Sequence, residues 1–212
     1  MSKVYGQYCP IAHALDLVGE RWSLLIVREL LYGPRRYTDL AASLPGIGTN
    51  ILAARLRDLE KCGIVAKRRL PPPAASQVYE LTPYGMELKP VIRELAVWGI
   101  HTLGPPDAGD ELEPEWLVHA LDTVFGPVAP AGSFEFRIGA EVASLVDGDV
   151  RPGAVEHADV VVETPDPMEF YYLFVERRWD GVTVRGDREL LERLLDVATA
   201  PATTAVRTPV SA

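Results

Sequence analysis

Apolar and polar positions alternate with the period of an α-helix through most of the first half of the chain. In residues 9–19, Ile11, Leu15 and Val18 recur three or four positions apart, which places them on one side of a helix. Prolines near the starts of such segments and glycines at their ends mark where helices begin and stop. The pattern predicts helices over residues 9–19, 21–34, 37–44 and 49–63, and a further one that starts at Thr82-Pro83.

The period changes between the last two of these helices. Residues 64–70 and 76–81 alternate as strands do, and a Pro-Pro-Pro-Ala-Ala segment joins them. Helix, helix, tight break, helix and hairpin is the order of a winged helix-turn-helix, in which the helix after the break enters the major groove and the hairpin is the wing. We therefore expect the first half to bind double-stranded DNA.

The helix over residues 49–63 carries side chains suited to reading bases. Leu52, Leu56 and Leu59 share the face that would pack on the domain, and Asn50 and Arg57 lie opposite. Asn can pair with adenine and Arg with guanine through two hydrogen bonds each. A solvated helix face has the same composition, so it is the order of the elements that favours DNA. The predicted DNA-contacting residues, with the flanking groups that would hold phosphates, are Arg35, Arg36, Thr38, Thr49, Asn50, Ala53, Arg57, Lys61, Lys67, Arg68 and Arg69.

Charge divides the chain in the same place as the pattern does. Residues 1–104 hold 13 Lys and Arg against 9 Asp and Glu, whereas the remainder holds 8 against 21, so that a basic half precedes a strongly acidic one within a total of −9. Such asymmetry is typical of a nucleic-acid module joined to a second domain. The composition of residues 104–114 is that of a linker, and the tail from residue 199 is expected to be disordered.

The helix that starts at Thr82-Pro83 has an apolar stripe that must be buried. One interpretation is a core contact with the first helix, and the other is a two-fold dimer interface, which a helix-turn-helix protein needs in order to read a two-part operator. The dimer is favoured, and the two can coexist. The predicted interface consists of Leu88, Val91, Ile92, Leu95 and Trp98.

Residues 9–99 resemble the HxlR-type bacterial transcription regulators. The segments that carry the resemblance are the Cys-Pro start, Gly-x-Arg-Trp, Leu-x-x-Leu-Glu-x-x-Gly-Ile-Val and Leu-Thr-x-x-Gly, in that order. The resemblance implies a non-enzymatic homodimer on an inverted-repeat operator, with a wing that usually carries an arginine where this chain has Ser76 and Gln77. It also implies that Cys9 stands where some members carry a cysteine that senses oxidants or electrophiles; a packed small residue is the alternative.

The acidic half mixes helices and strands irregularly. Its patterns predict a helix near residues 113–125, strands over 133–139, 141–149, 158–164 and 181–187, a helix that opens at residue 164 and a closing helix capped by Asp187. The whole chain is thus expected to be α+β, with a winged helix-turn-helix domain over 1–103, a linker over 104–114, an α+β domain over 115–198 and a tail over 199–212.

Residues 115–198 also resemble the sterol-carrier-protein type of lipid-transfer domain. The matching points are Phe134-x-Phe136-x-Ile138-Gly139, Asp147-Gly148, Ala158-Asp159-Val160 and Gly186-Asp187. The resemblance implies an apolar cavity for a small apolar or lipid-like effector; a filled core is the alternative. The predicted pocket residues are Phe134, Phe136, Phe170, Leu173 and Phe174.

The sequence gives little support to other functions. The four histidines are isolated, no phosphate-binding glycine loop occurs, and His157 near Asp159 is better explained as part of an exposed loop than as an acid–base site. We expect no catalytic residue, cofactor or metal, no membrane insertion and a cytoplasmic location. The rival hypothesis is a lipid-binding or protein-interaction module whose winged helix does not bind DNA.

Overall fold

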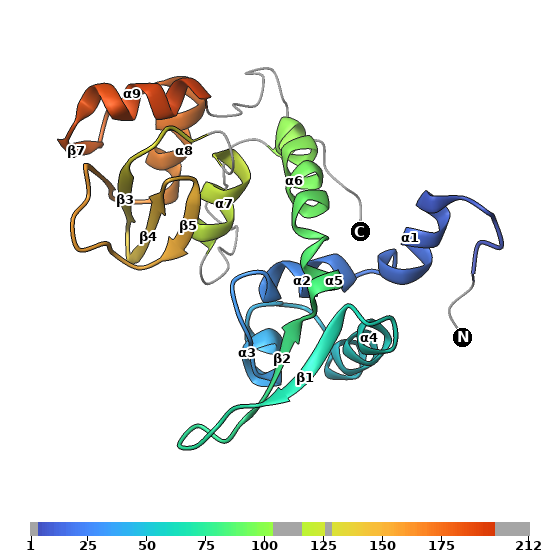
Figure 1. The fold of residues 1–212 in the computed structure, drawn as a ribbon. Helices are drawn as coiled ribbons and strands as arrows, with labels where there is room; N and C mark the ends of the chain where they lie inside the picture. Colours follow the sequence, from blue (N-terminus) through green and yellow to red (C-terminus); the bar gives the residue numbers. More distant parts are fainter. Residues whose placement is uncertain (1–3, 104–115, 126–128, 198–212) are drawn as a thin grey trace. The chain divides into compact units, whose positions relative to one another are not determined.

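The structure of the chain, a computed structural model, describes residues 4–103, 116–125 and 129–197 (Figure 1). The chain divides into two compact units, Met1–Ile92 and Arg93–Ala212, which we describe separately. The predicted linker over 104–114 and the predicted disordered tail from residue 199 lie outside the described residues. Within the described ranges, no helix has the length and apolar character needed to cross a bilayer.

The first unit has the element order of a winged helix-turn-helix, as predicted. Strands β1 and β2 pair antiparallel, with Val65 opposite Leu81 and Arg69 opposite Gln77, and form a hairpin that protrudes from the helices of the unit (Figure 1). The elements are α1 (Pro10–Val18), α2 (Ser23–Leu30), α3 (Tyr37–Ala42), α4 (Thr49–Lys61), β1 (Val65–Arg69), β2 (Gln77–Leu81), α5 (Pro83–Met86) and α6 (Lys89–Leu103), which continues beyond the unit.

The core of the first unit comes mainly from α2, α3 and α4. Ile26 and Val27 of α2 and Leu40 of α3 are fully buried, and the leucine face of α4 packs against them. Burying a side chain of this size stabilises the fold by about 1.5–3 kcal/mol relative to leaving it exposed. In α1, by contrast, Ile11 and Leu15 are exposed although they lie at helical spacing. The spacing thus predicted the helix, but not which of its faces this unit would bury.

Two glycines of the motifs Gly-x-Arg-Trp and Leu-Thr-x-x-Gly lie where a side chain has no room. A Cβ at Gly19 would lie 2.4 Å from the Leu15 carbonyl oxygen, and one at Gly85 would lie 2.1 Å from the Ile64 carbonyl oxygen. Gly85 also closes the turn that Thr82 caps, because its N–H donates to the Thr82 hydroxyl at 3.0 Å. Thr82 therefore caps the start of the helix as predicted, and the glycine lets that turn pack directly on the start of β1.

The single long helix expected after Thr82-Pro83 is wrong, because the structure divides it into α5 and α6. Between them, the N–H groups of Glu87 and Leu88 donate to residues only three positions back, at 3.2 and 3.1 Å. Pro90 lacks the N–H that a continuous helix would donate to the Met86 carbonyl, so an uninterrupted helix is unfavourable here. The apolar stripe consequently begins at the start of a new helix.

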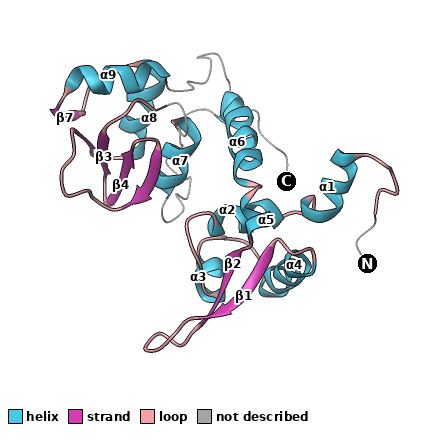
Figure 2. Cartoon of the chain, in the orientation of Figure 1, coloured by secondary structure: helices cyan, strands magenta, loops and turns pink. Residues whose placement is uncertain are grey.

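The second unit is built on a five-stranded sheet with the order β5-β4-β3-β6-β7. Figure 2 draws its strands in magenta. Strands β3 and β6 are parallel, and the other neighbours are antiparallel. Asp147 and Gly148 form the turn from β4 into a strand, β5, that the sequence analysis did not predict. The elements are α7 (Trp116–Val124), β3 (Ser133–Ile138), β4 (Glu141–Val146), β5 (Asp149–Pro152), β6 (Val160–Thr164), α8 (Pro167–Glu176), β7 (Thr183–Gly186) and α9 (Arg188–Val197).

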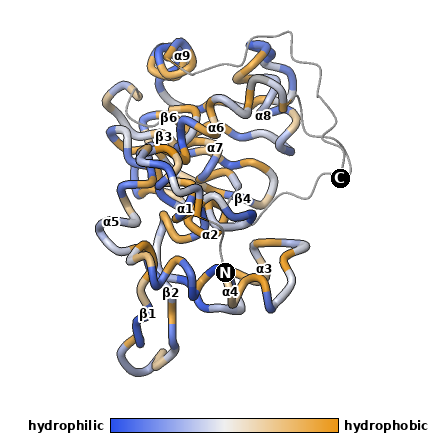
Figure 3. Tube along the Cα trace, turned by 90° about the vertical axis from the view of Figure 1, so that its right-hand side faces the viewer, coloured by the Kyte–Doolittle hydropathy of each residue, from blue (hydrophilic) through white to orange (hydrophobic). Residues whose placement is uncertain are grey.

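The two faces of this sheet differ in chemistry. Phe134, Phe136 and Val162 point toward the apolar core, where α7 packs on β4 and β5 while α8 and α9 pack on β6. Helix α9 carries both hydrophobic and hydrophilic positions (Figure 3), and its four leucines are buried. On the opposite face Arg137 pairs with Glu135 at 2.6 Å and with Glu163 at 3.4 Å. The helices thus cover the apolar face, and ion pairs occupy the other.

The second unit begins inside α6, earlier than the expected linker. Arg93 of α6 donates to the Asp122 carbonyl oxygen at 3.1 Å and to its carboxylate at 3.3 Å. Because Asp122 is buried, this pair fixes the later part of α6 on α7. Helix α6 therefore supplies its first residues to one unit and the rest to the other.

Asp159, directly before β6, is expected to make the stability of the second unit depend on pH. The backbone N–H and then the hydroxyl of Ser133 donate to the Asp159 carboxylate, both at 2.8 Å, and hold the pKa of Asp159 below its usual 3.8. Because the folded-state pKa is the lower one, this contribution to stability is complete above the unfolded-state pKa and is lost as the pH falls through the folded-state value. We expect the free energy of unfolding, measured with urea, to fall less between about pH 5 and about pH 2 in Asp159→Asn than in the wild-type chain. Asp196→Asn, an exposed control on α9, should keep the wild-type slope; equal slopes in the two variants would contradict the assignment.

Candidate nucleic-acid interface

Helix α4 presents a polar face to solvent and an apolar face to the core. Leu52, Leu56 and Leu59 are at most 1% exposed, whereas Asn50 and Arg57 lie on the exposed side. The Arg57 guanidinium donates through Nε to the Ala53 carbonyl oxygen at 3.1 Å and forms no ion pair with any described residue. The arrangement leaves a guanidinium and an amide available for two-hydrogen-bond contacts with base edges.

The start of α4 is fixed to α3. The Tyr37 hydroxyl donates to the Thr49 carbonyl oxygen at 2.7 Å, so Thr49 and Asn50 have a defined position in the first turn. Thr38, on the exposed side of α3, donates its hydroxyl to Asp39 at 3.2 Å. The helix-turn-helix thus has a hydrogen bond between its two helices as well as a shared core.

A second set of contacts joins α3 to the wing. The Arg36 side chain donates through Nε to the Ser76 hydroxyl at 3.2 Å, and its backbone N–H donates to Asp39 at 3.1 Å. Arg36 is exposed and has no carboxylate partner for its side chain within the described part of the chain. The serine at the position where the resembling family has a wing arginine therefore orients a different arginine.

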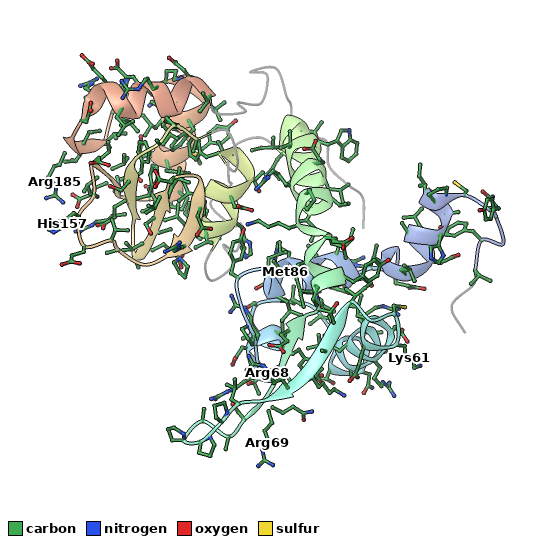
Figure 4. All side chains as sticks on the ribbon, viewed as in Figure 1. Lys61, Arg68, Arg69, Met86, His157 and Arg185 are labelled. Carbon is green, nitrogen blue, oxygen red and sulfur yellow. The ribbon has the colours of Figure 1, made fainter. Side chains whose placement is uncertain are left out.

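The basic residues of β1 differ in how much of their charge is free (Figure 4). Lys67 lies 3.2 Å from Glu60, and Arg68 lies 2.8 Å from Glu80. Arg69 extends away from the hairpin and, among the residues that the structure describes, donates only to the Ala75 carbonyl oxygen, at 3.3 Å. With Ala75 and Gln77, these three residues line a hollow of about 400 Å³ at the base of the wing. Arg69 is thus the cation of this strand that is free for a phosphate.

Arg35 has a different environment from the other predicted contacts. Its Nε donates to the Glu29 carbonyl oxygen at 2.8 Å, and its backbone forms a two-way bridge with Tyr79 of β2. The half-buried side chain thereby ties the loop before α3 to α2, and the backbone ties the same loop to the wing. This position supports the fold of the interface directly.

Carboxylates are the part of this surface that the sequence analysis missed. Asp58 accepts from Arg55 at 3.0 Å and lies 3.9 Å from Lys61, while Glu60 and Glu80 pair with the basic residues of β1. A signal was present, because helix spacing brings Asp58 beside Lys61 and the hairpin register places Glu80 diagonal to Arg68. Lys61 is still 77% exposed at its side chain, so its charge remains accessible.

The predicted dimer stripe separates into two groups in the structure. Leu88 and Ile92 are partly buried and pack against the core of the first unit. Val91, Leu95 and Trp98 are 47%, 45% and 77% exposed on α6. The contact with the core of the first unit therefore uses the first group, and the second group is exposed.

The five predicted pocket residues of the second unit are all buried, and three of them share ring contacts. The ring centroids of Phe170 and Phe174 are 4.4 Å apart, and Phe136 lies 6.1 and 6.2 Å from these two. Phe125 adds a contact of 5.1 Å to Phe174. These rings fill the space between sheet and helices, so an effector would bind here only if they moved apart.

Cys9 and Cys62 are both free thiols of intermediate exposure. Cys9 is the residue that precedes the first turn of α1, and Cys62 ends α4. Among the described residues, no group of three or more His, Cys, Asp and Glu side chains is arranged to hold a metal ion.

Comparison with known proteins defines the class to which this surface belongs. A helix-turn-helix with a polar α4 face and a β-hairpin wing is the architecture of winged helix-turn-helix transcription regulators. A family model described as HxlR-like helix-turn-helix matches residues 17–106. The chain is 39% identical over 122 residues to the uncharacterized HTH-type transcriptional regulator sll1512 of Synechocystis, covering 58% of this chain and 84% of that protein. The chain belongs to the HxlR-like helix-turn-helix family.

A second relative has a known structure. The HTH-type transcriptional regulator YodB of Bacillus subtilis is 35% identical over 106 residues, which are 50% of this chain and 95% of that protein. The crystal structure of quinone-bound YodB covers 43% of this chain and 97% of its own, with 34% identity and a TM-score of 0.38. The family match ends at residue 106, so it does not include the sheet of the second unit.

Proposed function

We propose that the chain is a transcription regulator that binds an inverted-repeat operator as a homodimer. The observation that carries this proposal is the two-sided α4: its leucines are buried, and Asn50 and Arg57 face solvent beside a hairpin with a free Arg69. Membership of the HxlR-like family supports the same function, because the relatives are named as transcription regulators.

Homodimerisation is proposed through the exposed part of α6. Val91, Leu95 and Trp98 form an apolar surface that water would otherwise cover, and two-fold pairing would bury it in two copies at once. Such a dimer would present two copies of α4, as an inverted repeat requires. Analytical ultracentrifugation of a Leu95→Glu chain tests the interface; a variant that sediments like the wild-type chain would exclude it.

Salt dependence tests the DNA-binding proposal directly. We expect the chain to bind a duplex from the region upstream of its own gene, with log affinity falling linearly against log salt concentration. Arg36, Lys61 and Arg69 on two protomers predict a slope near −5, because each phosphate contact contributes about −0.9. Fluorescence anisotropy at several salt concentrations measures it. Binding that is absent, or that does not change with salt, would instead favour a winged helix that serves protein interaction.

Regulation is proposed to come from a small apolar ligand in the second unit. This requires the phenylalanine cluster to open, so native mass spectrometry of the purified chain should show an apolar molecule that co-purifies. Oxidant or electrophile sensing by Cys9 is the second candidate, since a relative, YodB, has been crystallised in a quinone-bound form. A Cys9→Ala chain that still loses DNA affinity in benzoquinone would exclude that candidate.

A further inference from the structure

Two carboxylates hold two of the three basic residues of β1 within the chain. Glu80 Oε2 lies 2.8 Å from Arg68 Nε, and Glu60 Oε2 lies 3.2 Å from Lys67 Nζ. Arg69, the third basic residue, donates to an uncharged carbonyl oxygen instead. The strand that carries three consecutive cations therefore presents one of them without an ion-pair partner among the described residues.

The fold, rather than chance surface contact, positions both carboxylates. In the hairpin register Arg68 lies opposite Val78 and Ala66 lies opposite Glu80, so Glu80 is the diagonal neighbour of Arg68 on the same face. Glu60 projects from the last turn of α4, and Lys67 also lies 5.5 Å from the centroid of the Tyr79 ring. Each pair thus joins two elements whose positions the core has already set.

A phosphate that approaches this strand must compete with these carboxylates. Affinity arises when a protein cation neutralises a phosphate and releases the counterions condensed on the DNA, so a cation that stays paired with a carboxylate adds less to affinity. The side chains of Arg68 and Lys67 are 47% and 34% exposed. Both cations are therefore accessible to DNA phosphates once the carboxylates are neutral. The contacts affected are the ones that do not depend on base sequence.

We propose that Glu80 and Glu60 are specificity-determining residues, which act as internal competitors for backbone phosphates and lower the affinity of the wing for DNA of any sequence. The inference rests on the proposed function, because it assumes that α4 and the wing contact DNA. Weak sequence-independent binding leaves discrimination to the base contacts of α4. The relevant quantity is therefore the ratio of specific to non-specific affinity.

The test compares charge-neutral variants on a random-sequence duplex of about 30 base pairs, labelled with fluorescein, over roughly 50–200 mM KCl. Glu80→Gln should bind about ten- to sixtyfold more tightly near 0.1 M salt, and its slope should steepen by about 1.8, because Arg68 of each protomer becomes available for one more phosphate. Glu60→Gln should act in the same direction through Lys67. Glu87→Gln makes the same change in net charge at an exposed position after α5 and should keep the wild-type slope.

A second variant assigns the gain to one pair. Arg68→Gln combined with Glu80→Gln should lose the gain in affinity, whereas Arg68→Gln alone should weaken binding, because it leaves the Glu80 carboxylate unpaired beside the phosphates. Thermal unfolding midpoints of all variants, compared with wild type, show that the fold is retained. If Glu80→Gln and Glu87→Gln raise the affinity for DNA equally, a general charge effect is responsible and the inference is overturned. Salt-dependent binding by the wild-type chain would still leave the regulator proposal intact. If the wild-type chain binds no duplex at any salt concentration, both fail.

Discussion

Arg57→Ala should weaken binding to the upstream duplex by about 1–3 kcal/mol, or roughly five- to 150-fold, for each half-site that a protomer reads, which is the usual discrimination from one two-hydrogen-bond base contact. Arg57 is exposed, lies on the face of α4 opposite the buried leucines, and forms no ion pair in the described structure. Its hydrogen bond to the Ala53 carbonyl oxygen of its own helix is lost without cost to the core. The loss should therefore appear in binding and leave stability almost unchanged.

The control for Arg57 is an arginine outside the proposed interface. Arg193 is exposed on α9 of the second unit, and Arg193→Ala removes the same charge. Anisotropy titrations of both variants on the upstream and random-sequence duplexes separate base reading from general attraction. Arg57→Ala should reduce binding to the upstream duplex more than binding to the random one. An equal reduction on both duplexes would mean that Arg57 contacts phosphate only. If Arg57→Ala and Arg193→Ala bind equally well, α4 is excluded from the interface.

Phe136→Ala should lower the free energy of unfolding of the second unit by about 3–5 kcal/mol, the range for phenylalanine truncation in a core. Phe136 is fully buried on β3, and its ring packs between those of Phe125, Phe170 and Phe174. Removing it leaves a cavity that the surrounding strands and helices can fill only in part, so the lost contacts add to the lost burial.

Urea unfolding followed by fluorescence and circular dichroism measures this effect. Because the chain has two units, two transitions are expected, and only the one that reports the second unit should shift. Val197→Ala, at a position that is 40% exposed on α9, should change stability by no more than about 0.5 kcal/mol. A small effect of Phe136→Ala would show that the ring cluster is loosely packed, and would favour the ligand-binding cavity.

Periodicity predicted most of the elements because each one buries a single face. The leucines of α4 repeat at helical spacing and are buried as expected, and the alternating residues of β3 point to opposite faces of the sheet. The spacing does not show which other element packs against each apolar face. Ile11 and Leu15 have the spacing of core residues and yet are exposed, since burial depends on which element lies opposite. The break before α6 was visible only as Pro90, whose effect depends on a hydrogen bond that the pattern does not show.

The candidate interface was predictable in composition but not in electrostatics. The positions of Asn50 and Arg57 follow from the helical angle, and they are exposed on α4 as expected. Lys67 and Arg68 were predicted to contact DNA, but their carboxylate partners were not predicted, because these carboxylates are distant along the chain. Glu80 is twelve positions from Arg68, and only the hairpin register brings the two together. Charge counting thus overestimates how much of this surface attracts phosphate.

The order of the two units along the chain has a consequence for synthesis. All the strands and helices that build the reading surface, from α1 to α5, precede Ile92, and none of their sheet pairing requires a later residue. The second unit must wait, because β3 pairs in parallel with β6 and β6 in turn with β7, near the end of the described chain. Domains generally fold as units during translation, the N-terminal one first. The nascent polypeptide should therefore acquire a folded reading surface while the ribosome is still elongating the domain proposed to regulate it.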